Sequence, residues 1–145
     1  MPLNVWHDVA QAVEDDVFLL DVRDTRQVLH FYAGSNTWST KSPAPIDTSG
    51  ARMIVANGDL FVAGGDVSVL ARYTIATDTW LVCTPPTQRH CYGALFSREG
   101  KLYLVGGGDQ QDSVEEYDAG HDTWCVCDAS VPYEGKNLLA MTLDI

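Results

Sequence analysis

The chain alternates short apolar runs with polar turns. Ala51–Ala56 is one such run, and residues 60–63 form the next, after the turn Asn57-Gly58-Asp59. A glycine turn between two apolar runs is a hairpin signal, and the same arrangement returns at residues 92–96 and 102–105. Because no apolar stripe with a 3.6-residue period has useful length, we predict an all-β chain.

Three tryptophans divide the chain into units. Trp38, Trp80 and Trp124 stand 42 and 44 residues apart, and each ends the same kind of phrase. In each phrase an aromatic residue lies seven positions before Trp, and Asn or Asp followed by Thr comes directly before it. A fixed period of about 43 residues indicates a propeller or an array. We expect the repeated aromatics to fill the same gap between neighbouring units, as core rather than as a ligand site.

Each unit reads as four short strands. The second strand ends in a glycine pair, Gly64-Gly65 or Gly106-Gly107, and the third carries a tyrosine at the end of residues 69–73 or 114–117. The fourth strand starts at the tryptophan. Four-stranded units repeated radially make a β-propeller.

These residues also resemble a named family. A glycine pair closing a strand, then Tyr, then Trp seven residues on, is similar to the kelch repeat, and the resemblance runs from about residue 6 to residue 145. The first unit departs from the pattern, because Asp21-Val22 replaces the glycine pair and Phe31 replaces Tyr. The resemblance implies an all-β kelch β-propeller with three four-stranded blades, at about 6–46, 47–88 and 89–132, plus one extra C-terminal strand at about 136–145.

Three blades are fewer than a propeller ring needs, since rings have 4–8 blades. Asp8–Val13 occupies the first-strand position of the first unit, and residues 137–143 occupy that of a fourth. In kelch propellers the last strand often completes the first blade. We therefore expect the chain to be the C-terminal half of a longer kelch protein, with a homodimer that closes three blades on three as the alternative.

The charge of the chain excludes some classes of partner, and its cysteines bear on its compartment. The formal charge is -11 and only nine residues are Lys or Arg, which argues against nucleic acid and anionic membranes. No apolar stretch approaches 18 residues and no signal peptide is visible, so we expect a cytoplasmic protein with its four cysteines reduced. Cys125-Val126-Cys127 lacks the spacing and the second pair of a zinc knuckle.

No motif for catalysis stands out. The glycine pairs are followed by acidic residues and lack the Lys and helix of a phosphate loop. The acidic run from Glu115 to Asp122 contains His121, but the spacing does not match the iron site of some kelch-type plant proteins, so we expect a solvated strand face and turn. The prediction is a non-enzyme with no cofactor and no metal.

Function in repeat scaffolds usually lies in loops on one face. The loops before each first strand and after each glycine pair should emerge together. This chain resembles kelch adaptors, in which the residue at the place of Arg89 is often Arg and the residues at the places of Cys91 and Ser49 are often Ser. Both residue types commonly touch the bound peptide in those adaptors. In the second unit Asp47 stands where the pattern has Arg. The candidate partner-binding residues are Arg23, Arg26, Ser49, Asp66, Arg89, His90, Cys91, Asp109, Gln110, Gln111, Asp112 and Tyr133.

The resemblance therefore implies a protein–protein interaction module. The expected role is the substrate-recognition propeller of a BTB–kelch adaptor for a cullin-type ubiquitin ligase, with ligase contacts made by domains outside this sequence. The alternative is an actin-binding or scaffolding kelch protein. An enzyme on a kelch propeller would need a metal or a crosslinked residue.

Overall fold

The computed structural model describes residues 8–21, 26–108 and 112–128 of the 145-residue chain. Every regular element in these ranges is a β-strand, which confirms the all-β prediction. The described part of the chain has no helix able to cross a membrane.

The strands form three antiparallel four-stranded sheets, each in sequence order. The first blade contains β1 (Asp8–Val13), β2 (Asp16–Asp21), β3 (Val28–Tyr32) and β4 (Thr37–Lys41). The second contains β5 (Ala51–Ala56), β6 (Asp59–Gly64), β7 (Val69–Thr74) and β8 (Thr79–Val82). The third contains β9 (Ala94–Arg98), β10 (Lys101–Val105), β11 (Val114–Asp118) and β12 (Thr123–Val126).

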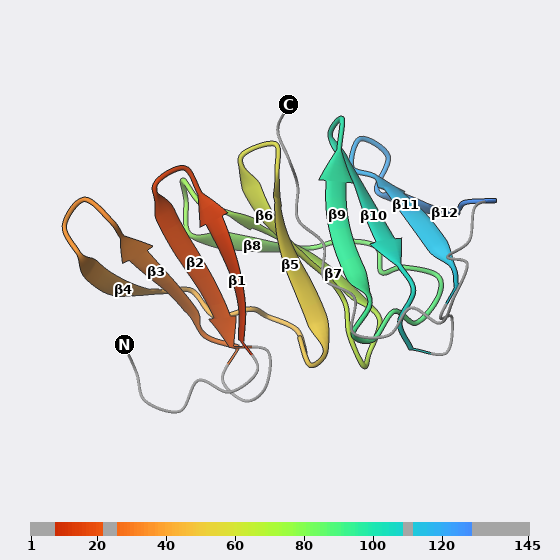
Figure 1. The fold of residues 1–145 in the computed structure, drawn as a ribbon, viewed down its shortest axis with the longest axis horizontal. Coiled ribbons are helices and arrows are strands. Elements are labelled where there is room, and N and C mark those ends of the chain that lie inside the picture. The colour runs from red at the N-terminus through yellow and green to blue at the C-terminus, as the bar shows by residue number, and fades with distance from the viewer. Residues whose placement is uncertain (1–7, 22–25, 109–111, 129–145) are drawn as a thin grey trace.

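The blades stand side by side, with β1 next to β5 and β5 next to β9 (Figure 1). This is the arrangement of a partial propeller, as predicted. The extra strand expected at about 136–145 lies outside the described residues.

Two apolar cores lie between the blades. The first joins blades 1 and 2 through side chains such as Phe18, Leu20 and Val62. The second joins blades 2 and 3 through Phe61, Leu104 and neighbouring side chains. Successive residues of a strand point to opposite faces, so β6 supplies both cores and is buried along its whole length. Blade 2 is therefore stabilised from both sides, at roughly 1.5–3 kcal/mol for each large apolar side chain buried.

The Tyr–Asp–Trp phrase of blade 2 ties that blade to the segment leaving blade 1. Asp78 accepts hydrogen bonds from the Tyr73 hydroxyl (2.7 Å) and from the Ser42 N–H (2.8 Å). The Trp80 indole donates to the Ser42 carbonyl at 2.9 Å. The Tyr73 hydroxyl, followed by the Ser42 N–H, lowers the pKa of the Asp78 carboxyl. The repeated aromatics thus pack between blades, as expected, and their polar atoms hold the incoming segment.

Blade 3 repeats this arrangement one unit later. Asp122 accepts from the Tyr117 hydroxyl (2.6 Å) and from the N–H and hydroxyl of Thr84 (2.9 and 2.8 Å). The Trp124 indole donates to the Thr84 carbonyl at 2.8 Å. Asp78 and Asp122 have φ of 54° and 52°, a left-handed turn conformation that Asp and Asn tolerate better than most residues. The Asp of the phrase therefore serves both the turn and the link between blades.

Blade 1 keeps the aromatic packing of the phrase but lacks the tyrosine hydroxyl. Phe31 packs on Trp38 with ring centroids 5.0 Å apart, close to the 5.1 Å between Tyr73 and Trp80. Phe31 has no hydroxyl to donate. The replacement of Tyr by Phe31 thus removes the hydroxyl that donates to Asp in the other two blades and leaves the aromatic contact in place.

A hydrogen-bonded pair of one acidic and one basic side chain joins the second and third strands of every blade. It consists of Asp16 with His30 in blade 1, Asp59 with Arg72 in blade 2, and Lys101 with Glu116 in blade 3. In each blade, an aromatic residue of the second strand lies two positions after the first member of the pair and opposite the second member. The three pairs therefore occupy equivalent positions. In blade 3 the acidic and basic partners have exchanged strands.

Candidate functional site

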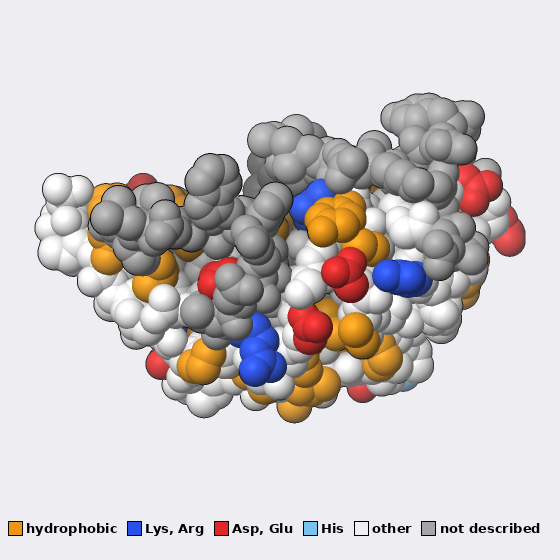
Figure 2. Space-filling view, turned by 90° about the horizontal axis from the view of Figure 1, so that it is seen from below, with side chains coloured by type: hydrophobic (Ala, Val, Ile, Leu, Met, Phe, Trp, Pro, Cys, Tyr) orange, Lys and Arg blue, Asp and Glu red, His pale blue; other side chains and the backbone are white. Residues whose placement is uncertain are grey.

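The loops that precede the first strands and follow the second strands emerge at one end of the blades (Figure 1). We call this end the loop face; its described residues are 26–27, 42–50, 65–68, 83–93, 106–108 and 112–113. Figure 2 shows basic, acidic and hydrophobic side chains interspersed near its centre. The face therefore suits a partner that offers both apolar and polar groups more than one of a single charge.

Backbone hydrogen bonds join loops within blade 2 and between blades 2 and 3. The Asp66 N–H donates to the Ser49 carbonyl at 2.7 Å, and the Tyr92 N–H donates to the Gly50 carbonyl at 3.2 Å. Within blade 3, glycine permits a similar closeness of two loops. A Cβ on Gly107 would lie 2.4 Å from the Gly93 nitrogen, and Gly107 also has φ of +77°. The predicted glycine pairs thus let two loops touch through their backbones.

Tyr92 is an exposed aromatic residue of this face. Its side chain is 45% exposed and its φ is 58°, which is unfavourable for a bulky residue. Arg52 supports it: the Nε donates to the Gly93 carbonyl at 2.9 Å, and the guanidinium carbon lies 6.0 Å from the Tyr92 ring centroid. Val67, 60% exposed, belongs to the adjacent β6–β7 loop. Strained residues concentrate at binding and active sites, so this exposed aromatic marks the face as a candidate interface.

The sequence prediction missed Tyr92, Arg52 and Val67. Tyr92 was assigned to the first strand of blade 3, but β9 begins at Ala94 because a left-handed residue cannot continue an extended strand. Nothing in the local sequence signals a left-handed tyrosine.

Ser49, Asp66 and Cys91 lie close together, as the sequence predicted for the loops. The Cys91 thiol donates to Asp66 Oδ1 at 2.5 Å. Burial, followed by the Asp66 carboxylate, raises the pKa of Cys91 to about 11, so the thiol stays protonated at neutral pH. The Ser49 N–H and hydroxyl both donate to Asp47, at 3.0 and 2.7 Å, and the N–H, followed by the hydroxyl, lowers the pKa of its carboxyl. Ser49 and Asp47 are thus engaged with each other within the loop.

Two candidates lie beneath the face. The side chains of His90 and Cys91 are buried, at 1% and 8% exposure, because both turn inward under the loop. This corrects the expectation that they offer side chains to a partner; they support the loop from below.

The other described candidates stay predictions as contact residues. Arg26, Asp66, Arg89 and Asp112 are exposed and Ser49 is half-buried. The remaining candidates, Arg23, Asp109, Gln110, Gln111 and Tyr133, lie outside the described residues.

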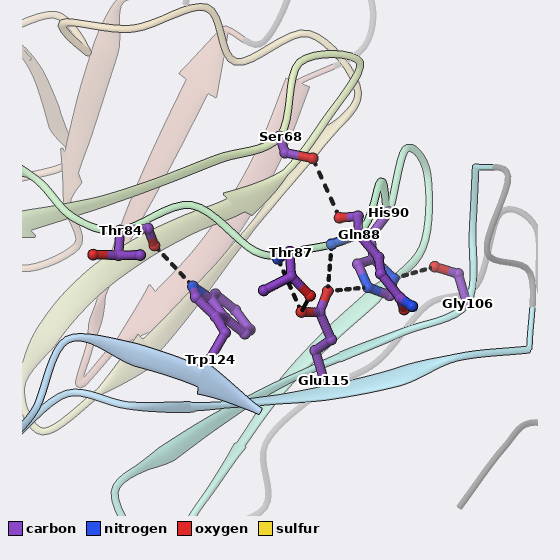
Figure 3. A network of polar contacts seen from close by, with 8 residues as sticks. All are labelled: Ser68, Thr84, Thr87, Gln88, His90, Gly106, Glu115 and Trp124. Atoms are coloured by element: carbon purple, nitrogen blue, oxygen red, sulfur yellow. Dashed lines mark hydrogen bonds and ion pairs between the residues drawn. The ribbon is translucent and has the colours of Figure 1, made fainter. Parts of the chain in front are cut away.

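A buried polar network underlies the loop that carries Arg89 and Tyr92 (Figure 3). Glu115 on β11 accepts from the Thr87 N–H and hydroxyl and from the Gln88 N–H, at 2.9, 2.5 and 3.1 Å. Its second oxygen also contacts His90 Nε2 at 2.8 Å. Burial raises the pKa of this carboxyl, but the hydrogen bonds of His90 and Thr87 outweigh it and the net pKa is lowered. The network fixes the start of the loop to blade 3.

The position of Glu115 corrects a second expectation. The acidic run was expected to be a solvated face, yet the Glu115 side chain is fully buried because alternate residues of β11 point inward. Glu116 points the other way and pairs with Lys101, and His121 pairs with Asp118 at the exposed turn, 2.8 Å apart. Among the residues that the structure describes, no three His, Cys, Asp or Glu side chains converge as metal ligands would.

Comparisons with known proteins agree with this architecture. No family model matches the chain. Kelch-like protein 35 of Mus musculus is 28% identical over 130 residues, covering 82% of this chain and 22% of that protein. Kelch-like protein 21 of Danio rerio is 28% identical over 107 residues (70% and 18%), and Kelch-like protein 36 of Bos taurus is 30% identical over 105 residues (63% and 17%). The chain thus spans about a fifth of the length of these relatives.

A solved structure supports the fold. The structure of YjhT superposes with a TM-score of 0.73 at 15% sequence identity, over 88% of this chain and 53% of that one. The sequence relatives and this shared fold confirm the resemblance to the kelch-repeat family. They point to a protein-interaction module rather than to a known class of enzyme.

Proposed function

We propose that this chain of kelch repeats binds a short segment of a partner protein on its loop face, as the substrate-recognition part of an adaptor for a cullin-type ubiquitin ligase. The observation that carries the binding proposal is Tyr92, an exposed aromatic with φ of 58° whose ring lies against Arg52. Interface residues that carry most of the binding energy are enriched in Tyr and Arg.

The surroundings of Tyr92 supply the two kinds of contact that a peptide segment needs. Val67 and the tyrosine ring offer apolar area, and Arg89 and Asp66 offer opposite charges on exposed loops. A rigid frame holds these loops, since backbone hydrogen bonds link them. Little ordering of the loops is then needed on binding, which favours affinity.

The binding proposal is tested with peptides selected from a displayed library of short random sequences. We expect Tyr92→Ala and Arg89→Ala each to weaken the selected peptides by about tenfold or more, equivalent to about 1.4 kcal/mol. The matched controls are Leu81→Ala, on the exposed outer strand β8, and Arg98→Ala, at the β9–β10 hairpin away from the loop face. Loss of binding in the controls, with the loop-face variants unaffected, would move the interface elsewhere.

The ligase role is supported by the kelch-adaptor resemblance and is tested separately. The full-length protein that contains this chain should co-purify with a cullin, and a loop-face variant should keep that cullin while losing the selected peptide. If a partner binds the loop face but no cullin co-purifies, the protein is an interaction module that does not act in a ubiquitin ligase. Co-sedimentation with actin filaments would identify the alternative function.

We propose that the protein is cytoplasmic, where its four free cysteines would remain reduced. Fluorescence imaging of the full-length protein tests this, and accumulation in the secretory pathway would refute it.

A further inference from the structure

The side chain of His90 is enclosed between two oxygen atoms. Its Nδ1 lies 2.7 Å from the Gly106 carbonyl and its Nε2 lies 2.8 Å from Glu115 Oε2, with both side chains shielded from water (Figure 3). A carbonyl oxygen can only accept, so Nδ1 carries a hydrogen. The remaining question is where the proton between Nε2 and Oε2 resides.

The other contacts of Glu115 answer it. Three donors, the N–H and hydroxyl of Thr87 and the N–H of Gln88, point at the carboxyl oxygens. Hydrogen bonds from several donors favour the ionised form of a carboxyl group. A protonated Oε2 would also be a poorer acceptor for the Gln88 N–H. The proton therefore belongs on the imidazole.

We propose that His90 and Glu115 form a buried imidazolium–carboxylate pair that positions the loop bearing Arg89 and Tyr92. The pair has no net charge, which lessens the cost of burying it, and both N–H groups of the imidazolium have an acceptor. His90 and Glu115 are positioning residues, because the loop side chains above them are the ones that face solvent.

The pair links several parts of the loop face. Glu115 comes from β11, Gly106 follows β10, and Thr87 and Gln88 belong to the segment that joins blade 2 to blade 3. The Gln88 carbonyl accepts from the Ser68 hydroxyl of the β6–β7 loop at 3.2 Å. The proton between His90 and Glu115 thus helps to fix the relative positions of loops from blades 2 and 3. The assignment of the pair is independent of binding; its effect on a partner rests on the proposed function.

The protonation state is tested by NMR on the wild-type chain with 15N-labelled histidine, assigned through the backbone. We expect both ring nitrogens of His90 to bear a proton at pH 7. In Glu115→Gln the amide donates to Nε2, so we expect a neutral ring with a proton on Nδ1 alone. A neutral ring already present in the wild type would overturn the proposal.

The positioning role is tested by the alkylation rate of Cys91, which neighbours His90 and is buried against Asp66. We expect Glu115→Gln to raise this rate about tenfold or more at constant pH, with exposed Cys125 as internal reference. Cys83 packs on the second core and reports general loosening of the blades. The matched control is Glu116→Gln on the same strand, which we expect to leave Cys91 protected.

Three outcomes are distinguishable. Faster labelling of Cys91 with Cys83 unchanged supports the proposal. Unchanged labelling of Cys91, or equal acceleration of Cys91 and Cys83, refutes a local positioning role. None of these results depends on a partner, so failure of peptide binding would leave the assignment of the pair intact.

Discussion

Replacement of Tyr73 by Phe isolates one hydrogen bond of the link between blades 1 and 2. The Tyr73 side chain is fully buried and its hydroxyl donates to Asp78 at 2.7 Å. Phe fills the same space, so no cavity term arises. A hydrogen bond to a charged group contributes about 1.5–3 kcal/mol. Asp78 keeps its bond from the Ser42 N–H, so we expect a loss near the lower end of that range, about 2 kcal/mol.

The loss is measured as the free energy of unfolding in urea and as the melting temperature. For a domain of this size about 2 kcal/mol corresponds to a fall of about 4–8 °C. Tyr92→Phe is the matched control, because that side chain is exposed, and we expect its melting temperature to stay within about 1 °C of wild type. Equal effects of the two substitutions would refute the reasoning that the repeat tyrosine acts through Asp78 as well as through packing.

Two further predictions concern the loop face. Gly107→Ala should destabilise by more than 1 kcal/mol in urea unfolding, roughly the cost of a left-handed Ala before the clash with Gly93 is added; a melting temperature equal to wild type would contradict it. Acid should weaken the wild type through Glu115: its lowered pKa gives stability that is fully present above the ordinary value of 4.5 and is lost as pH falls through the folded value. Glu115→Gln should therefore show a flatter fall of the urea midpoint below pH 4.5, and parallel curves would show that Glu115 is not involved.

The sequence was sufficient for the blades because their signals are periodic and local. Trp80 and Trp124 each end the same phrase because each indole contacts the segment that enters its blade. Their spacing therefore gives the length of the repeat directly. The strand order followed from hairpin turns such as Asn57-Gly58.

The site was harder to predict because its determinants are contacts between units. His90 and Glu115 are 25 residues apart, and their burial depends on how the segment between blades 2 and 3 folds over β11. Tyr92 is exposed because a left-handed backbone turns it outward, and its support comes from Arg52, 40 residues earlier. Such partners leave no local pattern, so a loop position could be predicted while its burial could not.

The exchanged charge pair of blade 3 has a consequence for engineering by blade exchange. Blades 2 and 3 share strand order and antiparallel pairing, which makes transfer of single strands between them attractive. A chimaera with β6 beside β11 would place the aspartate of one pair against Glu116, and β10 beside β7 would place Lys101 against Arg72. Like charges on neighbouring strands are destabilising. The second and third strands of these blades are therefore transferable only together, as a unit that carries its own charge order.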